Sequence, residues 1–111
     1  MKDSSDYLRE AAEYIAEHGH HKGSYEHWSA GAEHPVTCAL GALRRVTGDR
    51  GMMGGRFYEA AALLGSHLER EGLIPRYEGV VPLSHIPIWN DAPERTAEDV
   101  ILAMKRAAED E

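Results

Sequence analysis

Residues 56–71, RFYEAAALLGSHLERE, show the clearest helical pattern in this 111-residue chain. Their apolar side chains recur at spacings of three and four residues, which is the pattern of an amphipathic helix with one buried face. Gly72 follows and is a typical helix stop. The buried stripe consists of Phe57, Ala60, Ala61, Leu64 and Leu68. The segment therefore predicts a domain built from packed helices.

Three further helices are predicted on either side of this segment. One spans about residues 6–18, and another begins near Pro35 and runs to Val46. The last begins after Thr96, whose spacing to Asp99 approximates a capping box. Their apolar stripes consist of Tyr7, Leu8, Ala11, Tyr14 and Ile15, then Val36, Ala39, Leu40, Leu43 and Val46, then Val100, Ile101, Met104 and Ala108.

Two long connections separate these helices. Residues 19–34 contain three glycines, four histidines and Trp28 without helical or strand periodicity, which predicts a loop long enough to be functional. Residues 73–89 interleave three prolines with apolar residues, a pattern that favours an extended strap, with room for one short hairpin around 78–79. The predicted fold is mainly α: a single helical domain over residues 1–111, with about four helices and two long irregular connections.

Composition limits the class of partner. The chain has 12 basic and 19 acidic residues, so its formal net charge is −7. Repulsion from phosphate disfavours nucleic-acid binding in general and leaves a protein or a small molecule as the expected partner. No stretch has the apolar length of a membrane span or the pattern of a secretory signal, so we expect a cytoplasmic protein with no membrane partner. The single cysteine excludes an internal disulfide framework.

Gly41 lies inside the second predicted helix, between Ala39 and Ala42. A glycine in a helix interior costs about 1 kcal/mol of stability relative to alanine. We therefore expect another part of the chain to approach the backbone closely at this position, and a neighbouring helix is the simplest candidate.

A histidine-rich segment before this helix raises the question of metal or thiol chemistry. The candidate metal ligands are His20, His34 and Cys38, and the last two are four residues apart, so a helical turn would bring them onto one face. The helix N-terminus would lower the pKa of the Cys38 thiol, which with His34 would then be a candidate catalytic pair. Against both ideas, no pair has the tight spacing of structural zinc sites, and a lone cysteine is commonly a buried apolar residue. Our preferred prediction is no metal, no cofactor and no catalytic residue.

The loop before residues 56–71 has two features of a binding surface. Gly51-Met52-Met53-Gly54 matches the G-x-x-G string with which some domains clamp a nucleotide backbone. The basic residues around it are Arg44, Arg45, Arg50 and Arg56. The sheet that such domains require is not predicted, and the string is common, so phosphate or nucleic-acid binding stays an alternative. Met52 and Met53 would equally form an adaptable contact for a protein.

The segment Trp89-Asn90-Asp91, together with Arg95, allows two interpretations. In the structural one, Trp89 fills the junction between the strap and the helices. Asn90 or Asp91 then caps the turn that Pro93 opens, and Arg95 pairs with Asp91. In the functional one, the same side chains form a recognition surface.

Three stretches together resemble a family of small proteins of unknown function from actinobacteria and the phages that infect them. The stretches are Leu8-Arg9 to Ala12 followed by Glu17-His18-Gly19, then Cys38-Ala39-Leu40-Gly41-Ala42-Leu43, then Trp89-Asn90-Asp91 with Arg95-Thr96 and Val100. The resemblance implies a helical fold in which the C-A-L-G-A and W-N-D segments are the shared framework. It implies no activity, and a phage source would suit a protein directed at a host partner.

These observations predict a non-enzymatic interaction module that binds a partner protein through residues 20–34, through residues 52–53, or through both. The candidate binding residues are Trp89, Asn90, Asp91, Arg95, Met52 and Met53. The alternatives are the metal- or thiol-dependent small-molecule site described above and phosphate or nucleic-acid binding through residues 44–56. An exposed patch around Gly41 or Met52 would indicate a homodimer.

Overall fold

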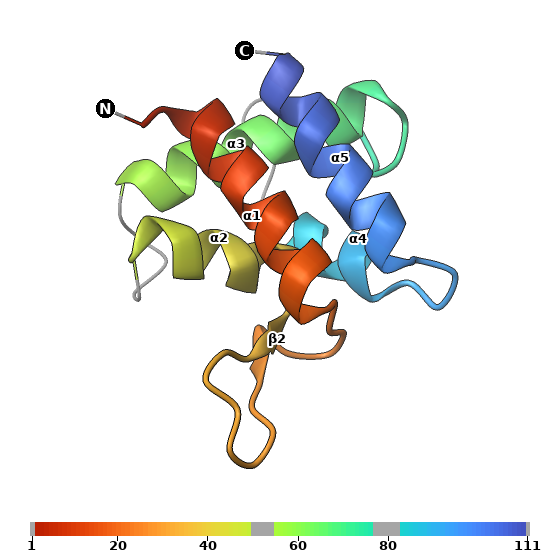
Figure 1. Ribbon diagram of the computed structural model, residues 1–111. Helices are drawn as coiled ribbons and strands as arrows, with labels where there is room; N and C mark the ends of the chain where they lie inside the picture. Colours follow the sequence, from red (N-terminus) through yellow and green to blue (C-terminus); the bar gives the residue numbers. More distant parts are fainter. Residues whose placement is uncertain (1, 50–54, 77–82, 111) are drawn as a thin grey trace.

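In the computed structural model, which describes residues 2–49, 55–76 and 83–110, helices dominate and one short hairpin projects from them (Figure 1). The helices are α1 (Ser4–His18), α2 (Ala39–Thr47), α3 (Gly55–Arg70), α4 (His85–Asp91) and α5 (Ala97–Glu109). The strands are β1 (Glu26–His27) and β2 (Val36–Thr37). The predicted mainly α fold is confirmed. Across the described ranges, no helix has the length and apolarity needed to cross a bilayer.

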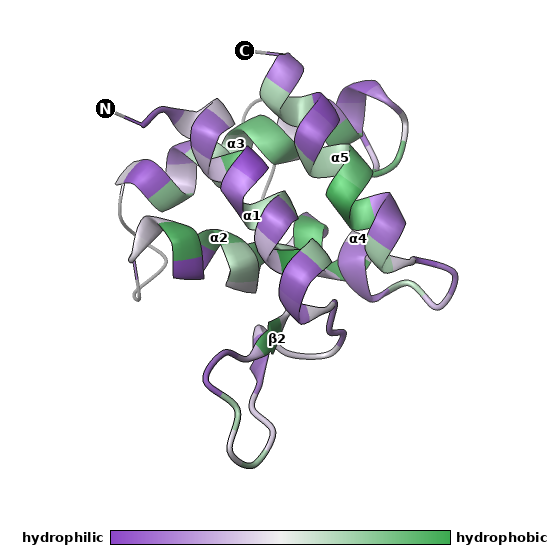
Figure 2. Cartoon of the chain, viewed as in Figure 1, coloured by the Kyte–Doolittle hydropathy of each residue, from purple (hydrophilic) through white to green (hydrophobic). Residues whose placement is uncertain are grey.

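Helix α1 occupies the middle of the packing. It lies beside α5 and also contacts α2 and α3, so its apolar stripe is covered on several sides. In Figure 2, hydrophobic and hydrophilic segments alternate along α2, α3 and α5, as expected for helices with one buried face. The largest fully buried apolar side chains are Phe57, Leu8, Ile15, Leu40, Leu43, Leu64, Leu68, Ile86, Met104 and Val100. The predicted stripes therefore meet in one core.

Reciprocal hydrogen bonds define the starts of α1 and α5. The carboxylate of Asp3 accepts from the backbone N–H of Asp6 (2.9 Å), and the carboxylate of Asp6 accepts from the N–H of Asp3 (3.0 Å). Because Asp3 is the cap, α1 begins at Ser4, slightly earlier than predicted. The same exchange between Thr96 and Asp99 (3.1 and 3.0 Å) confirms the predicted capping box of α5.

The predicted start of α2 near Pro35 is wrong. Val36 and Thr37 instead form β2, which pairs antiparallel with Glu26 and His27 of β1. Two consecutive β-branched residues suit this extended pairing better than a helix. The helix therefore begins at Ala39, and the chain between the strands forms the tip of the projecting hairpin (Figure 1).

The predicted extended strap is wrong at its C-terminal end, where α4 forms. Pro87 is the third residue of this helix. The first-turn N–H groups of a helix have no intrahelical partner, so a proline there removes no hydrogen bond. The hairpin predicted around 78–79 lies outside the described residues.

The close approach predicted at Gly41 is confirmed, but the approaching group is the backbone of the hairpin rather than another helix. A Cβ built on Gly41 would lie 2.0 Å from the carbonyl oxygen of Tyr25. The same oxygen accepts a hydrogen bond from the N–H of Cys38 (3.2 Å). Gly41 therefore provides the space in which the hairpin meets the first turn of α2.

We predict that Gly41→Ala destabilises the fold by at least about 2 kcal/mol. The added methyl group cannot coexist with a backbone carbonyl at that distance, and overpacking of this kind costs about 1–3 kcal/mol or more. Urea unfolding followed by circular dichroism measures the loss. Gly55→Ala is the matched control, because Gly55 begins α3, is exposed and has no atom within 4 Å of an added Cβ. Equal stability of Gly41→Ala and the wild type would contradict the proposed packing.

Candidate functional site

The W-N-D segment lies in α4, and its asparagine joins three parts of the chain. Asn90 is completely buried (0% exposed). Its side-chain oxygen Oδ1 accepts from the backbone N–H of Ala39 (3.0 Å) and lies 2.7 Å from Nε2 of His20. Its Nδ2 donates to the carbonyl oxygen of His21 (3.1 Å) and to Oδ1 of Asp91 (2.9 Å). The amide is therefore fully used within the fold.

These contacts also determine the hydrogen-bonding role of the Nε2 atom of His20. Nδ2 of Asn90 faces the carbonyl oxygen of His21, which can only accept, so the amide has one permitted orientation. Oδ1 then faces His20, and Nε2 of His20 must donate the hydrogen bond. His20, which follows α1, therefore donates a hydrogen bond to Asn90 of α4.

The N-terminus of α2 receives two caps. Sγ of Cys38 accepts from the N–H of Gly41 (3.3 Å), and Oδ1 of Asn90 accepts from the N–H of Ala39. We expected Asn90 or Asp91 to cap a turn nearby in the sequence. Asn90 instead satisfies a helix end 51 residues away.

Trp89 and Arg95 form a second structural unit. The indole is almost entirely buried (4% exposed), and the guanidinium of Arg95 lies 4.6 Å from its ring centroid. Nε of Arg95 also donates to the carbonyl oxygen of Trp89 (2.9 Å). The carboxylate that faces Arg95 is that of Asp99 (4.0 Å) rather than the predicted Asp91. Because cation–π contacts strengthen when water is excluded, this arrangement stabilises the turn between α4 and α5.

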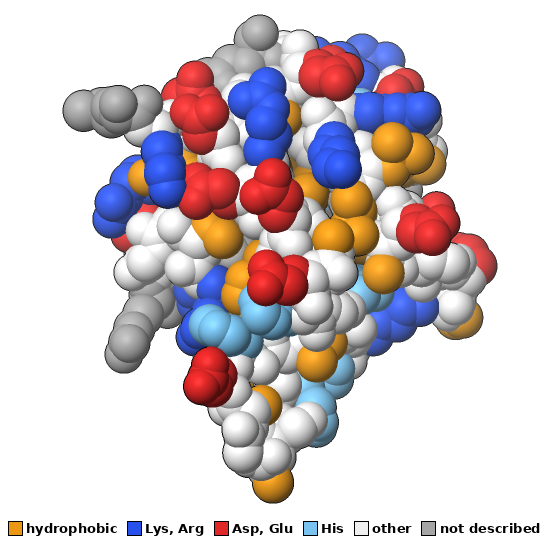
Figure 3. Space-filling model, in the orientation of Figure 1, with side chains coloured by type: hydrophobic (Ala, Val, Ile, Leu, Met, Phe, Trp, Pro, Cys, Tyr) orange, Lys and Arg blue, Asp and Glu red, His pale blue; other side chains and the backbone are white. Residues whose placement is uncertain are grey.

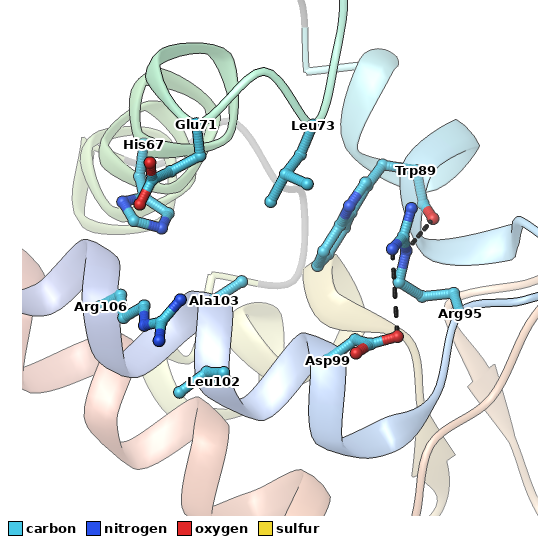
Figure 4. A pocket seen from close by; sticks show the side chains of 9 residues that line it. All are labelled: His67, Glu71, Leu73, Trp89, Arg95, Asp99, Leu102, Ala103 and Arg106. Atoms are coloured by element: carbon cyan, nitrogen blue, oxygen red, sulfur yellow. Dashed lines mark hydrogen bonds and ion pairs between the residues drawn. The ribbon is translucent and has the colours of Figure 1, made fainter.

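A hollow of about 310 Å³ adjoins Trp89 (Figure 4). Its apolar part is formed by Trp89, Leu73, Leu102 and Ala103. Figure 4 shows the side chain of Arg106 reaching toward it from α5, with His67 and Glu71 coming from the end of α3. This hollow could not be predicted from the sequence, because its residues come from three distant segments.

His67 links the end of α3 to the C-terminal end of α5. Its buried ring places Nδ1 2.5 Å from Oδ2 of Asp110, and Nη2 of Arg70 donates to the same oxygen (2.7 Å). The hydrogen bond from His67, aided by the charge of Arg70, holds the pKa of Asp110 below its usual value. The sequence carried one signal for this contact: His67 lies three residues after Leu64, on the buried stripe of its helix.

The hairpin presents aromatic side chains over two arginines. Trp28 is 52% exposed, and Arg45 lies 5.5 Å from its ring centroid. Arg44 lies 5.5 Å from the ring of Tyr25 and forms an ion pair with Glu26 (2.8 Å). A hollow of about 540 Å³ lies between this side of the hairpin and α2. We call the set Tyr25, Glu26, Trp28, Arg44 and Arg45 the hairpin cluster.

The candidate metal ligands His20 and His34 have different partners in the structure. His20 contacts Asn90, whereas the ring of His34 packs on His18 with centroids 4.5 Å apart. Burial raises the pKa of the Cys38 thiol, which outweighs the lowering expected from the helix N-terminus. Within residues 2–49, 55–76 and 83–110, no group of three or more histidine, cysteine or acidic side chains could hold a metal ion.

The predicted binding loop of residues 44–56, with its arginines and methionines, is only partly described by the structure. Met52, Met53 and the G-x-x-G string lie outside the described residues, as does Arg50. At its edges, Arg44 pairs with Glu26 as above, and Arg56 pairs with Asp49 (3.4 Å). Two of the four arginines in the predicted basic patch therefore face carboxylates. Gly41 is buried, so no exposed patch surrounds it.

A family model matches residues 1–110 and is described as a family of unknown function (DUF6197). The chain belongs to this family. Since the match covers nearly all of the chain, the α2 and α4 segments that meet at Asn90 both lie within the matched domain. Comparison with curated proteins and with solved structures gave no match.

We predict that Asn90→Ala destabilises the protein by about 2–4 kcal/mol. The change leaves the buried N–H of Ala39 without its partner, at a cost of about 1–3 kcal/mol, and also removes one partner of the part-buried carbonyl of His21. Chemical denaturation measures the difference, with Glu94→Ala as the control because Glu94 is exposed. A loss no larger than that of the control would contradict the role of Asn90 as a structural link.

The His67–Asp110 contact predicts a pH-dependent contribution to stability. Because the pKa of Asp110 is lower in the folded state than in the unfolded state, its carboxylate stabilises the fold above the unfolded pKa of about 4. The contribution is lost as the pH falls through the lower folded pKa. We expect Asp110→Asn to lower the melting temperature at pH 6, and the gap from the wild type to close toward pH 3. Glu109→Gln, an exposed neighbour, is the control, and a gap that did not narrow between pH 6 and pH 3 would contradict this assignment.

Proposed function

We propose that this protein is a non-enzymatic interaction module that binds a partner protein through its projecting hairpin. The observation that carries the proposal is the exposed indole of Trp28, which lies over Arg45 of α2. Tryptophan, tyrosine and arginine are the residues most enriched at the energetic centres of protein interfaces. The hairpin cluster contains all three: its aromatic residues lie on the projecting hairpin (Figure 1), and its arginines lie on α2.

The cluster is held in place before any partner arrives. Nε1 of Trp28 donates to the carboxylate of Glu26 (3.1 Å), which is itself paired with Arg44. Lys22, just before the hairpin, donates to the carbonyl oxygen of Ala92 after α4 (2.7 Å). Side chains that are already ordered lose less conformational entropy on binding. The order of these side chains favours binding to a specific protein over non-specific hydrophobic association.

The W-N-D segment takes an indirect part in this proposal. Asn90 holds His20 and His21 at the base of the hairpin, and Trp89 with Arg95 anchors the far side of α4. These residues would orient the binding surface without touching the partner. Residues 52–53 remain a second proposed contact.

Source and location are further parts of the proposal. The resemblance noted above supports a source in actinobacteria or their phages and, for a phage protein, a host protein as the partner. A cytoplasmic location is proposed from the same resemblance and from the charge pattern of the sequence. Neither part is needed for the binding role of the hairpin.

The two alternative functions have less support from the geometry. A thiol or metal site would need Cys38 and His34 together, yet they have different neighbours and the thiol is buried. Phosphate binding would need free guanidinium groups, yet Glu26 and Asp49 already neutralise two of the arginines.

The test is site-specific photo-crosslinking from position 28. A photoreactive amino acid replaces Trp28 in cells of the source organism, and the same residue replaces Tyr58, an exposed side chain of α3, as the control. We expect one protein to crosslink from position 28 only. The purified partner should then bind Trp28→Ala at least about thirtyfold more weakly than the wild type, a loss of about 2 kcal/mol typical of an interface hot spot. Equal binding of Trp28→Ala and Tyr58→Ala, or no specific crosslink, would overturn the proposal.

A further inference from the structure

A second surface lies on α3, α4 and α5, away from the hairpin. The hollow beside Trp89 adjoins another of about 300 Å³, and the two share Leu73, Trp89 and Arg95. Leu73, Ile88 and Leu102 are three of the six large hydrophobic side chains that are exposed in the described part of the chain. All three line this double hollow, which we call the α4 groove. Figure 3 shows hydrophobic side chains over α5 and beside the loop after α3, with charged groups around them.

The charges around the α4 groove cancel. Its acidic lining residues are Glu71 and Asp99, and its basic ones are Arg95 and Arg106, so their formal charges sum to zero with histidines counted as neutral. The whole chain has a net charge of −7. Two copies of this protein therefore repel one another on average, and the lining of the α4 groove adds no net charge to that repulsion.

The groove also contains both a projection and a recess. Ile88 is 71% exposed, the largest exposed fraction among the described large hydrophobic residues, and it borders the second hollow. In a two-fold symmetric contact, each copy supplies the same patch, so a projecting side chain must meet a recess on that same patch. The recess lined by Leu73, Pro75 and Trp89 has room for the side chain of a second Ile88.

We propose that the chain forms a symmetric homodimer through the α4 groove. Ile88 of each copy inserts beside Leu73 and Trp89 of the other, and the balanced charges of the rim face one another. A stable dimer buries about 800 Å² on each partner, roughly an eighth of the 6323 Å² surface of this chain. The proposed contact includes both hollows, from Ile88 to Leu102. The patch differs from the one expected around Gly41 or Met52.

The dimer is independent of the function proposed for the hairpin. The hairpin projects beyond one end of the helices, whereas the α4 groove is formed by α4, the end of α3 and α5 (Figure 1). Pairing through the groove leaves both copies of Trp28 exposed. The dimer would then offer two binding sites to a partner with repeated contact points.

Sedimentation velocity over a range of concentrations up to about 1 mM tests the proposal. We expect the wild-type mass to rise to twice that of the chain. Ile88→Asp should raise the dissociation constant at least about tenfold, because it places a charge at the centre of the contact. Ile88 is exposed, so the variant folds normally, which circular dichroism verifies. Tyr58→Asp is the matched control, an exposed aromatic of α3 outside the groove, and it should dimerise like the wild type.

A charge-reversal series tests whether the dimer depends on the balanced charges of the groove or only on its apolar side chains. Glu71→Arg and Arg106→Glu each unbalance the groove by two charges and should weaken the dimer, whereas the double variant restores balance and dimerisation. A wild-type protein that stays monomeric at every concentration overturns the proposal, as does equal weakening by Ile88→Asp and Tyr58→Asp. Crosslinking from position 28 is scored on the monomeric variant too, so a failed dimer and a failed hairpin contact give different results.

Discussion

The arrangement of this fold depends on the buried amide of Asn90. One side chain satisfies the first N–H of α2, the carbonyl oxygen of His21 and the donor of His20. The N–H of Ala39 is buried and the other two groups are part-buried, at the junction of α1, α2 and α4. Since a buried polar group without a hydrogen bond costs more free energy than a satisfied one gains, the amide fixes these segments relative to each other. The hairpin leaves the helices from this junction.

The C-A-L-G-A and W-N-D motifs, on which the family resemblance rests, meet at the same point in space. In C-A-L-G-A, Cys38 caps the first turn of α2 and Gly41 leaves room for the carbonyl of Tyr25. In W-N-D, Asn90 caps the same turn from a position 51 residues later in the chain. The two short motifs therefore act together: they cap the first turn of α2 and hold the hairpin against it. The sulfur of Cys38 and the amide of Asn90 are used to build the fold, which fits the absence of any reaction suggested by either motif.

Sequence periodicity predicted the helices well because burial of an apolar stripe is encoded locally. The stripe of α3 and the cap at Thr96 could both be read from neighbouring residues. The start of α2 was missed because Val36 and Thr37 pair with residues nine and eleven positions earlier, and no local rule selects those partners. The partner of Asn90 was missed for the same reason. The exposure of Trp28 could not be predicted either, since an isolated tryptophan is equally suited to a core.

The hydrogen-bonded junction around Asn90 also limits where a partner can bind. The amide of Asn90 is fully hydrogen-bonded and the thiol of Cys38 is buried, so neither offers an unused group to a ligand. In the described part of the chain, two sets of side chains are held outward: those of the hairpin cluster and the apolar residues beside Trp89. Both surfaces combine apolar area with paired charges, which suits another protein surface better than a phosphate or a metal ion. The hydrogen bonds that use the polar atoms of Cys38 and Asn90 thus also fix the hairpin relative to α2 and α4.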